Sequence, residues 1–419
     1  MRNTFPCLRV FMVRTNLHAV IVSLLLMVVS QASATQKIVG FDPVISSAER
    51  VKRIESIGGK VIREFHLIDA LVAAIPENIK DTDIYSLNGV ISIEEDKYLK
   101  WIEDVPAALP LSSVEAALVQ IKTGGYEVLK NLPTPAAQDI TDEEKEIPWG
   151  VKRVNGPAAW HVTMGEGVKV AVIDTGIDFT HPDIWGNYAD GYNAITLSTS
   201  PADAMDDNGH GTHVAGTIAA VRDIKGVVGV APRARIYGVK VLDYYGSGQV
   251  SWIISGIEWA VDNKANVINM SLGAYFSVDS LAQAVTAAYK KGIVIVCAAG
   301  NTSGEVNYPA KYPESIAVSA SDSSDKIADF SSRGPEIAFI APGVEVYSTS
   351  PGASYSTKSG TSMASPHVAG LVALAISLGA DTPVKVREAL IKAAVKLDLQ
   401  SDEQGAGLID AGKLMGDLK

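Results

Sequence analysis

Short, nearly continuous apolar runs rich in β-branched residues recur through the second half of the chain, and amphipathic segments lie between them. Runs of this kind are typical of strands buried on both faces of a parallel sheet, and their alternation with helices indicates right-handed crossovers. The pattern therefore predicts an α/β domain over residues 146–419, with a mostly parallel central sheet flanked by helices. The expected strands are 168–173, 236–242, 267–270, 293–297 and 316–319, and the expected helices include 250–263 and 281–290.

The sequence before this domain predicts a different order of elements, namely strand, helix, strand, strand, helix, strand. The first helix places Ala48, Val51 and Ile54 on one face, which is the spacing of an amphipathic helix. We therefore expect a small α+β domain over residues 35–102, and a unit of this size folds only marginally without a partner surface. Its expected strands are 37–41, 60–65, 70–75 and 90–94.

Two further segments have the composition of processing or connecting sequence. Residues 1–34 have the layout of a secretory signal, with three arginines before the apolar stretch 19–29 and small residues at 32–34. This stretch is short for a membrane span, and an uncleaved anchor is the alternative. Residues 103–145 are rich in Pro, Ala and acidic residues, which predicts a linker. We expect a secreted, extracellular protein without stable membrane association once the signal is removed.

The overall composition narrows the choice of partners. The chain has 47 Asp and Glu against 36 Lys and Arg, a formal net charge of -11, which argues against a nucleic-acid partner. Cys7 would leave with the signal, so only Cys297 would remain and no internal disulfide could form. Bound metal is then a candidate source of stability. We expect the protein to be a monomer.

Four polar residues that could take part in catalysis lie at expected strand ends or at a helix start. Asp174 follows the strand 168–173, and Asn301 follows the strand 293–297. His210 lies in Asn-Gly-His-Gly-Thr-His, and Ser362 lies in Gly-Thr-Ser-Met-Ala-Ser-Pro before an apolar helix. Three of them have a plainer reading on their own, as a turn aspartate, a helix-capping serine and a turn asparagine, and the neighbouring His213 alone reads as a packed, hydrogen-bonded histidine.

Rival chemistries fit these motifs less well. An aspartic protease needs a second Asp-Thr-Gly, which the chain lacks, and a zinc peptidase needs His-Glu-x-x-His, whereas His210 and His213 have no glutamate between them. Ala364 breaks the Gly-x-Ser-x-Gly pattern of lipases and esterases. The apolar setting of Cys297 favours an inert thiol over a nucleophile. The Asp206-Asp207 pair reads as a solvated turn, with cation binding as the alternative.

Taken together, in the order Asp, His, Ser, these motifs resemble the subtilisins, the secreted subtilases of bacteria and archaea. Further matches are Gly-Ser-Gly-Gln from Gly246, Asn-Met-Ser-Leu-Gly from Asn269 and Ala-Ala-Gly-Asn from Ala298, so the resemblance covers almost the whole chain. It implies a serine endopeptidase acting on proteins and peptides with broad specificity. A secreted pseudoprotease that keeps the fold for binding is the non-enzyme alternative.

The resemblance assigns roles to the four polar residues. Ser362 would be the nucleophile, His210 the general base and Asp174 the carboxylate that orients it, while the Asn301 amide would face the oxyanion. Residues 35–102 look like the family's inhibitory propeptide, a small α+β ferredoxin-like domain, and the chain would be a self-processing zymogen. The position of the final maturation cut, between about Ile102 and Ile147, stays open.

The family's substrate-binding segments also have counterparts here. An extended substrate would pair with two edges, and the walls of the primary pocket would follow the strand 293–297. Asn307 and Ala310 stand where the family often has glycine, so the pocket should be shallow and favour medium apolar or aromatic side chains. The implied binding residues are Gly246, Ser247, Gly248, Ser271, Leu272, Gly273, Ala298, Ala299 and Gly300.

A structural calcium site is the remaining implication of the resemblance. The segment 221–227 matches the family's calcium loop in length, and most ligands there are backbone carbonyls. One family ligand falls where this chain has Lys145, which cannot bind calcium, and Glu144 or Glu146 are the possible substitutes. The implied ligand residues are Asp183, Val221, Asp223, Lys225 and Val227.

Overall fold

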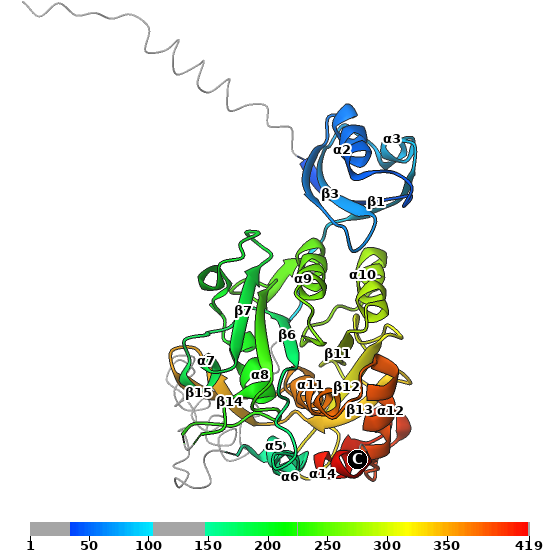
Figure 1. Cartoon of the computed structure of the whole chain (residues 1–419). Coiled ribbons are helices and arrows are strands. Elements are labelled where there is room, and N and C mark those ends of the chain that lie inside the picture. The colour runs from blue at the N-terminus through cyan, green and yellow to red at the C-terminus, as the bar shows by residue number, and fades with distance from the viewer. Residues whose placement is uncertain (1–33, 104–146, 224, 418–419) are drawn as a thin grey trace, which may run out of the picture.

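The computed structural model describes residues 34–103, 147–223 and 225–417. The expected signal segment and linker lie almost entirely outside these residues, as do Glu144, Lys145 and Glu146. The described chain forms a small N-terminal domain, residues 34–103, that sits against a larger domain, residues 147–417, which the resemblance implies to be catalytic and which is called the catalytic domain below (Figure 1). No helix among these residues is long and apolar enough to cross a membrane.

The N-terminal domain has the predicted order of elements. Its four-stranded antiparallel sheet has the order β2-β3-β1-β4, and a side-chain cluster around Phe41, Ile54 and Leu71 packs the two helices on one face. Ser46 and Glu49 form a capping box that begins the first helix. The elements are β1 (Ala34–Phe41), α2 (Ser47–Ser56), β2 (Lys60–Glu64), β3 (Ala70–Pro76), α3 (Asp81–Tyr85), β4 (Val90–Glu95) and β5 (Tyr98–Lys100).

The other face of this small sheet lies on two helices of the catalytic domain, α9 (Val250–Asp262) and α10 (Asp279–Lys290) (Figure 1). Alternation along the strands explains this, because Ile38 and Val72 join a core cluster with residues of those helices, while Val39 and Leu71 point to the domain's own helices. The domain therefore buries its second face only against the catalytic domain, as its small size leads one to expect.

The catalytic domain is built on a nine-stranded sheet with the order β16-β17-β13-β12-β11-β10-β6-β8-β7. Every pairing is parallel except that of the edge strand β16 with β17. The strands are β6 (Lys169–Asp174), β7 (Tyr188–Asn193), β8 (Arg235–Lys240), β10 (Val267–Met270), β11 (Val294–Ala298), β12 (Ser315–Ser321), β13 (Ile337–Pro342), β16 (Ala394–Val395) and β17 (Leu408–Ile409).

Helices cover both faces of this sheet, which confirms the predicted architecture. In β6, Val170 and Val172 pack with α8 (His210–Ala219) and α11 (Thr361–Ser377), whereas Ala171 and Ile173 pack with α9 and α10. The remaining helices are α5 (Trp149–Arg153), α6 (Gly156–Ala159), α7 (Pro182–Trp185), α12 (Pro383–Ala393), α13 (Ser401–Gln404), α14 (Ala411–Asp417) and the 3₁₀ helix η2 (Pro201–Ala204). Two strands form a hairpin, β14 (Val346–Ser350) and β15 (Ser354–Lys358), and β9 (Ser247–Gln249) pairs with β5.

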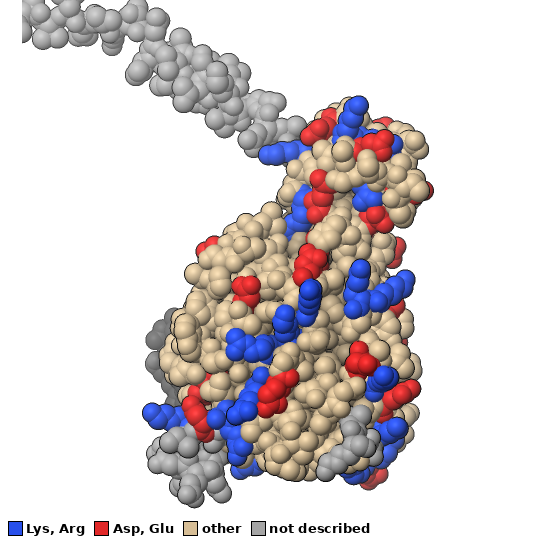
Figure 2. Space-filling model, in the orientation of Figure 1, with Lys and Arg blue, Asp and Glu red and all other residues tan. Residues whose placement is uncertain are grey.

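The strand order places a crevice at the carboxyl ends of β6 and β10. From β6 the chain continues to β7 and β8 on one side, and later strands from β10 onward lie on the other. Ligand sites in such sheets form where the connections diverge in this way. Both charge signs occur on the visible surface, where Lys and Arg side chains gather in a short band over the catalytic domain (Figure 2).

Candidate active site

Asp174 and His210 meet at the crevice. Asp174 is the last residue of β6 and is fully buried, and its Oδ1 lies 2.8 Å from Nδ1 of His210, the first residue of α8. The backbone N–H of Thr175 also donates to this oxygen, at 2.7 Å. A Cβ on Gly211 would lie 2.1 Å from the carbonyl oxygen of Gly176, so only glycine allows α8 to begin this close to the strand end.

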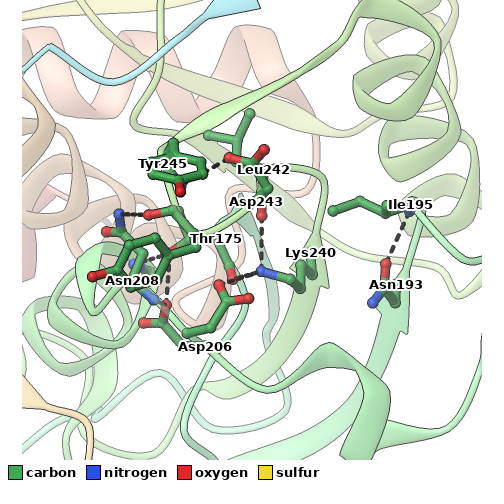
Figure 3. A network of polar contacts seen from close by, with 12 residues as sticks. Thr175, Asn193, Ile195, Asp206, Asn208, Lys240, Leu242, Asp243 and Tyr245 are labelled. Atoms are coloured by element: carbon green, nitrogen blue, oxygen red, sulfur yellow. Dashed lines mark hydrogen bonds and ion pairs between the residues drawn. The ribbon is translucent and has the colours of Figure 1, made fainter.

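A buried network around Thr175 and Asp206 joins the segment that follows β6 to the segment that precedes α8 (Figure 3). Asp206 accepts hydrogen bonds from the Thr175 hydroxyl, the Thr212 hydroxyl and three backbone N–H groups, and Thr175 accepts one from the N–H of Gly211. The prediction that the pair of aspartates at 206 and 207 forms a solvated turn is therefore wrong for Asp206. All these donors come from the chain itself, and they leave no evident place for a cation.

Lys240 extends this network from the end of β8. Its ammonium group lies 2.7 Å from the Thr175 carbonyl oxygen, 2.9 Å from the Leu242 carbonyl oxygen and 2.7 Å from Oδ1 of Asp207. The lysine is almost fully buried, so these three acceptors replace the water that its charge loses. Nothing in the sequence around Lys240 predicts this role, because it depends on three separate loops.

Ser362 is the second residue of α11, and its hydroxyl donates to the carbonyl oxygen of Ser271 at 3.1 Å. Pro366 lies in the second turn of this helix, so its missing N–H leaves the Ser362 carbonyl without its helical donor. The hydroxyl of Ser271 donates to that carbonyl at 2.9 Å and takes the place of the missing donor. Asn269 and Ser365 extend the same chain of hydrogen bonds.

Asn301 lies beside the nucleophile candidate with its amide group oriented. Its Oδ1 accepts hydrogen bonds from both the N–H and the hydroxyl of Thr361, each at 2.9 Å. Because Oδ1 is occupied in this way, Nδ2 is the group that remains for a ligand near Ser362. In addition, Nε2 of His210 is buried and has no hydrogen-bond partner within the part of the chain that the structure describes.

A pocket opens next to these residues. Ala298, Gly300 and Asn307 line it together with Asn301 and Ser362. Ala299 instead is fully buried in the core, and Ala310 is buried but does not line the pocket. Asn307 packs close to Gly300, because a Cβ built on that glycine would lie 2.8 Å from the Asn307 side chain.

The two predicted edge segments both contact the chain's own residues 98–103. β5 pairs antiparallel with β9, matching Tyr98 with Gln249, Leu99 with Gly248 and Lys100 with Ser247. On the opposite side, the N–H of Gly273 donates to the Trp101 carbonyl oxygen at 2.9 Å. An extended segment is therefore held between two edges and leads to the pocket beside Ser362.

The other histidines and the cysteine of the crevice region are buried in different surroundings. His213 lies within α8, with Nε2 near the carbonyl oxygens of Val346 and Ser356, and burial is the main cause that lowers its pKa to about 3. Burial also lowers the pKa of His367 to about 4. Cys297 is fully buried, and burial raises the pKa of its thiol to about 12. None of these groups has the open position that a nucleophile or general base needs.

Comparison with known proteins adds evidence from the sequence to this geometry. A profile of the Subtilase family matches residues 165–407, which include all four candidate residues.

The chain belongs to the subtilase family.

This subtilase is similar to subtilisin E of Bacillus subtilis, with 39% identity over 390 residues that cover 90% of each chain. It is 47% identical to a subtilisin of Bacillus pumilus over 273 residues, which are 64% of this chain and 98% of that one. An alkaline protease of Shouchella clausii is 39% identical over 341 residues, or 81% of this chain and 87% of the relative. The resemblance inferred from the motifs is confirmed, and the protein is a serine endopeptidase.

The residues of this subtilase that were expected to bind calcium lie close to one another. Among the described residues, however, no three or more His, Cys, Asp or Glu side chains form a group that could hold a metal ion. Asp183, in α7, is buried, and its Oδ2 accepts from the N–H of Val227 at 2.9 Å, while its carbonyl accepts from the N–H of Val221. Burial is the main cause that raises the pKa of Asp183, and the negative charge of Asp223 adds to it. A cation beside these carboxylates would relieve both effects.

Proposed function

We propose that this subtilase is a secreted endopeptidase of broad specificity, made as a self-processing zymogen, that works through an acyl-enzyme on Ser362. The observation that carries the proposal is the course of residues 98–103, which run between the two edge segments as a peptide substrate would and end beside Ser362 and Asn301. The signal-like layout of residues 1–34 supports secretion.

In the proposed mechanism His210 activates the nucleophile. Nε2 of His210 accepts the Ser362 hydroxyl proton as Oγ attacks the scissile carbonyl carbon, and later passes it to the leaving amine. Asp174, held by Thr175 and buried, keeps the proton of the neutral imidazole on Nδ1 and stabilises the imidazolium that forms. Water then hydrolyses the ester by the same steps in reverse order.

The developing oxyanion is stabilised by two donors. One is the backbone N–H of Ser362, in the first turn of α11 where N–H groups lack helical acceptors. The other is Nδ2 of Asn301, which Thr361 orients through the opposite end of the amide. Since both donors are fixed before substrate arrives, they need little reorganisation in the transition state.

Substrate binding uses main-chain pairing and one shaped pocket. β9 and the segment 271–273 offer backbone groups that can pair with an extended peptide. Because backbone pairing does not depend on the side chains of the substrate, it supports broad specificity. Asn307 narrows the primary pocket, which supports a preference for medium apolar or aromatic side chains over the largest ones. A cleavage profile led by Arg or Lys at this position would contradict the preference.

The N-terminal domain acts as the inhibitor of its own enzyme. Glu94 accepts hydrogen bonds from the backbone N–H groups of Asp279 and Ser280 at the start of α10, and Asp96 accepts from the N–H of Ser251 at the start of α9. Carboxylates at helix N-termini are favourable, because free N–H groups and the helix dipole meet them there. These contacts position residues 98–103 across the active site and exclude other substrates.

Calcium is the proposed structural ion. The Asp183 carboxylate, the Asp223 side chain and the carbonyl oxygens of Val221, Lys225 and Val227 would hold it, as oxygen ligands suit this cation. Its role is to stabilise the loop 221–227 against α7, and no catalytic step passes through it.

A serine-directed phosphonylating reagent tests the central assignment. The processed wild-type enzyme should gain one label on Ser362 and lose activity, and Ser362→Ala should gain none. Ser354→Ala, which removes an exposed hydroxyl from β15, is the matched control and should label as the wild type does. Labelling that persists in Ser362→Ala would overturn the assignment.

A further inference from the structure

The segment that enters the active site does not run as a regular strand. The N–H groups of Trp101 and Ile102 both donate to the carbonyl oxygen of Gly246, at 3.0 and 3.2 Å. Two consecutive residues therefore face one residue of the partner segment, which defines a β-bulge. The regular pairing of β5 with β9 ends one residue earlier, at Lys100 and Ser247.

The bulge shifts the register of everything that follows it. Ile102 packs over Gly246, since a Cβ built on that glycine would lie 3.1 Å from the Ile102 Cβ. Trp101 and Glu103 instead both border the pocket that contains Ser362 and Asn301, whereas Ile102 does not. Side chains of an extended chain point alternately to opposite sides, so Glu103 is the residue that the bulged segment presents at the primary pocket.

Trp101 holds the bulge in place. Its side chain is 2% exposed and packs in the core cluster that contains Leu272 and Val250. Its indole N–H donates to the Gly248 carbonyl oxygen at 2.9 Å, and its own carbonyl accepts from Gly273 on the opposite edge. The residue therefore binds both edges and buries its ring between them, which makes a regular, unbulged alternative costly.

We propose that self-processing cuts the chain on the carboxyl side of Glu103, one residue beyond the boundary expected from the sequence, and that Trp101 is the positioning residue that sets this register. The inference rests on the proposed self-processing. In the step itself, Ser362 Oγ bonds to the Glu103 carbonyl carbon while its proton passes to His210. The peptide C–N bond then breaks, the amine leaves with that proton, and water hydrolyses the ester to free the Glu103 carboxylate.

The pocket need not prefer glutamate for this cut to occur. The scissile bond is tethered by a docked domain, and an intramolecular reaction of this kind gains several powers of ten in effective concentration. Glu103 is half-buried, and burial raises the pKa of its carboxyl group, which eases its placement in an uncharged pocket. Cleavage of foreign substrates, which lack this tether, depends on the pocket alone.

Mass spectrometry of the first N-terminal fragment that the full chain releases tests the proposal. Its last residue should be Glu103 in the wild type. Trp101→Phe keeps the apolar ring but loses the indole donor, and should raise the share of fragments ending at Ile102 by about fivefold, the worth of roughly one hydrogen bond. Trp101→Ala loses both, and its cut should move mainly to Ile102.

Two controls separate register from other effects. Glu103→Gln should leave the cut after residue 103, because the bulge and not the charge sets its position. Tyr85→Ala, which removes an exposed aromatic ring from α3, should leave the fragment unchanged. If Trp101→Ala fails to fold, the wild type and Trp101→Phe still decide the matter.

The outcomes also distinguish this inference from the function on which it rests. A wild-type fragment that ends at Ile102 overturns the register while leaving self-processing intact. A fragment that also forms in full-length Ser362→Ala, expressed in the same host, shows a foreign protease and overturns self-processing. Unchanged fragment ends in both Trp101 variants remove Trp101 from its positioning role.

Discussion

The hydroxyl group of Ser271 donates a hydrogen bond to the carbonyl oxygen of Ser362, the oxygen that Pro366 deprives of its helical donor. In return, the hydroxyl of Ser362 donates to the carbonyl oxygen of Ser271. The end of β10 and the start of α11 are therefore joined at Ser362 itself. This pairing fixes the backbone from which the proposed nucleophile and one proposed oxyanion donor project.

Ser271→Ala tests the value of this link. The variant leaves a buried carbonyl without a donor, which should lower the free energy of unfolding by about 1–3 kcal/mol. It should also lower kcat by about tenfold, since loss of roughly 1.4 kcal/mol of transition-state stabilisation has that effect. KM should change little, because the backbone of the edge segment is retained. Steady-state kinetics on a chromogenic peptide and denaturant unfolding of the inhibited enzyme measure the two effects.

Ser319→Ala is the matched control for this prediction. Ser319 is equally buried and donates to the Glu403 carbonyl oxygen, but it lies in β12 away from the crevice. Its loss should cost comparable stability with kcat unchanged. An equal loss of kcat in both variants would show a general effect of stability and refute the positioning role of Ser271.

The strand ends that carry the site could be predicted from the sequence because apolar runs reveal where buried strands stop. Asp174 comes at the end of such a run and Asn301 comes shortly after another, so the pattern alone brought them to one edge of the sheet. The roles of Asp206 and Lys240 could not be predicted in this way. Their partners belong to separate loops, and a charged residue at a strand end or in a loop has the same local sequence pattern whether its side chain is solvated or buried.

Strands without an apolar run could not be predicted from the sequence either. β7 contains Asp190 and Gly191, residue types that are depleted in strands, and the β14 and β15 hairpin is rich in serine, so neither contains the apolar run that would reveal a buried strand. Their pairing partners stabilise them in the folded protein. The bulge at Trp101 belongs to the same class, since it depends on the opposing carbonyl of Gly246.

The buried thiol provides a negative test of the mechanism. Burial raises the pKa of Cys297 to about 12, so almost no thiolate exists at neutral pH, and the side chain is inaccessible. Iodoacetamide should neither label nor inactivate the folded, processed enzyme, and the same sample should take up one label per chain after denaturation. Stoichiometric labelling of the native enzyme with loss of activity would instead support a thiol nucleophile.

Calcium should stabilise the processed enzyme through Asp183. A ligand present at about 100 times its Kd contributes about 2.7 kcal/mol, which corresponds to a rise in Tm of roughly 5–10 °C for a domain of this size. Asp183→Asn keeps an acceptor for the Val227 N–H but loses the charge, and should abolish most of the rise. Asp398→Asn, at an exposed position, should respond as the wild type does. A Tm that chelator and calcium leave unchanged in the wild type would exclude the site.

His66 should make the binding of the N-terminal domain to the catalytic domain depend on pH. It lies 3.1 Å from Glu258 and 3.0 Å from Asp262, both on α9, and the hydrogen bond to Asp262 is the main cause that raises its pKa in the docked state. A raised pKa means that the protonated histidine favours docking. This contribution is fully present below the free value of about 6.5 and is lost as pH rises through the docked pKa.

The processed complex, in which the cleaved N-terminal domain stays bound, allows this to be measured. Its dissociation constant should rise by at most about fivefold from pH 6 to pH 9, because an exposed ion pair contributes no more than about 1 kcal/mol. Burial also raises the pKa values of Asp96 and Glu103, so the His66→Gln variant is needed to separate the contribution of the histidine from theirs. His66→Gln should remove the pH dependence and His161→Gln, at an exposed site of the catalytic domain, should retain it. Tighter binding at alkaline pH in the wild type would reverse the sign and refute the role of His66.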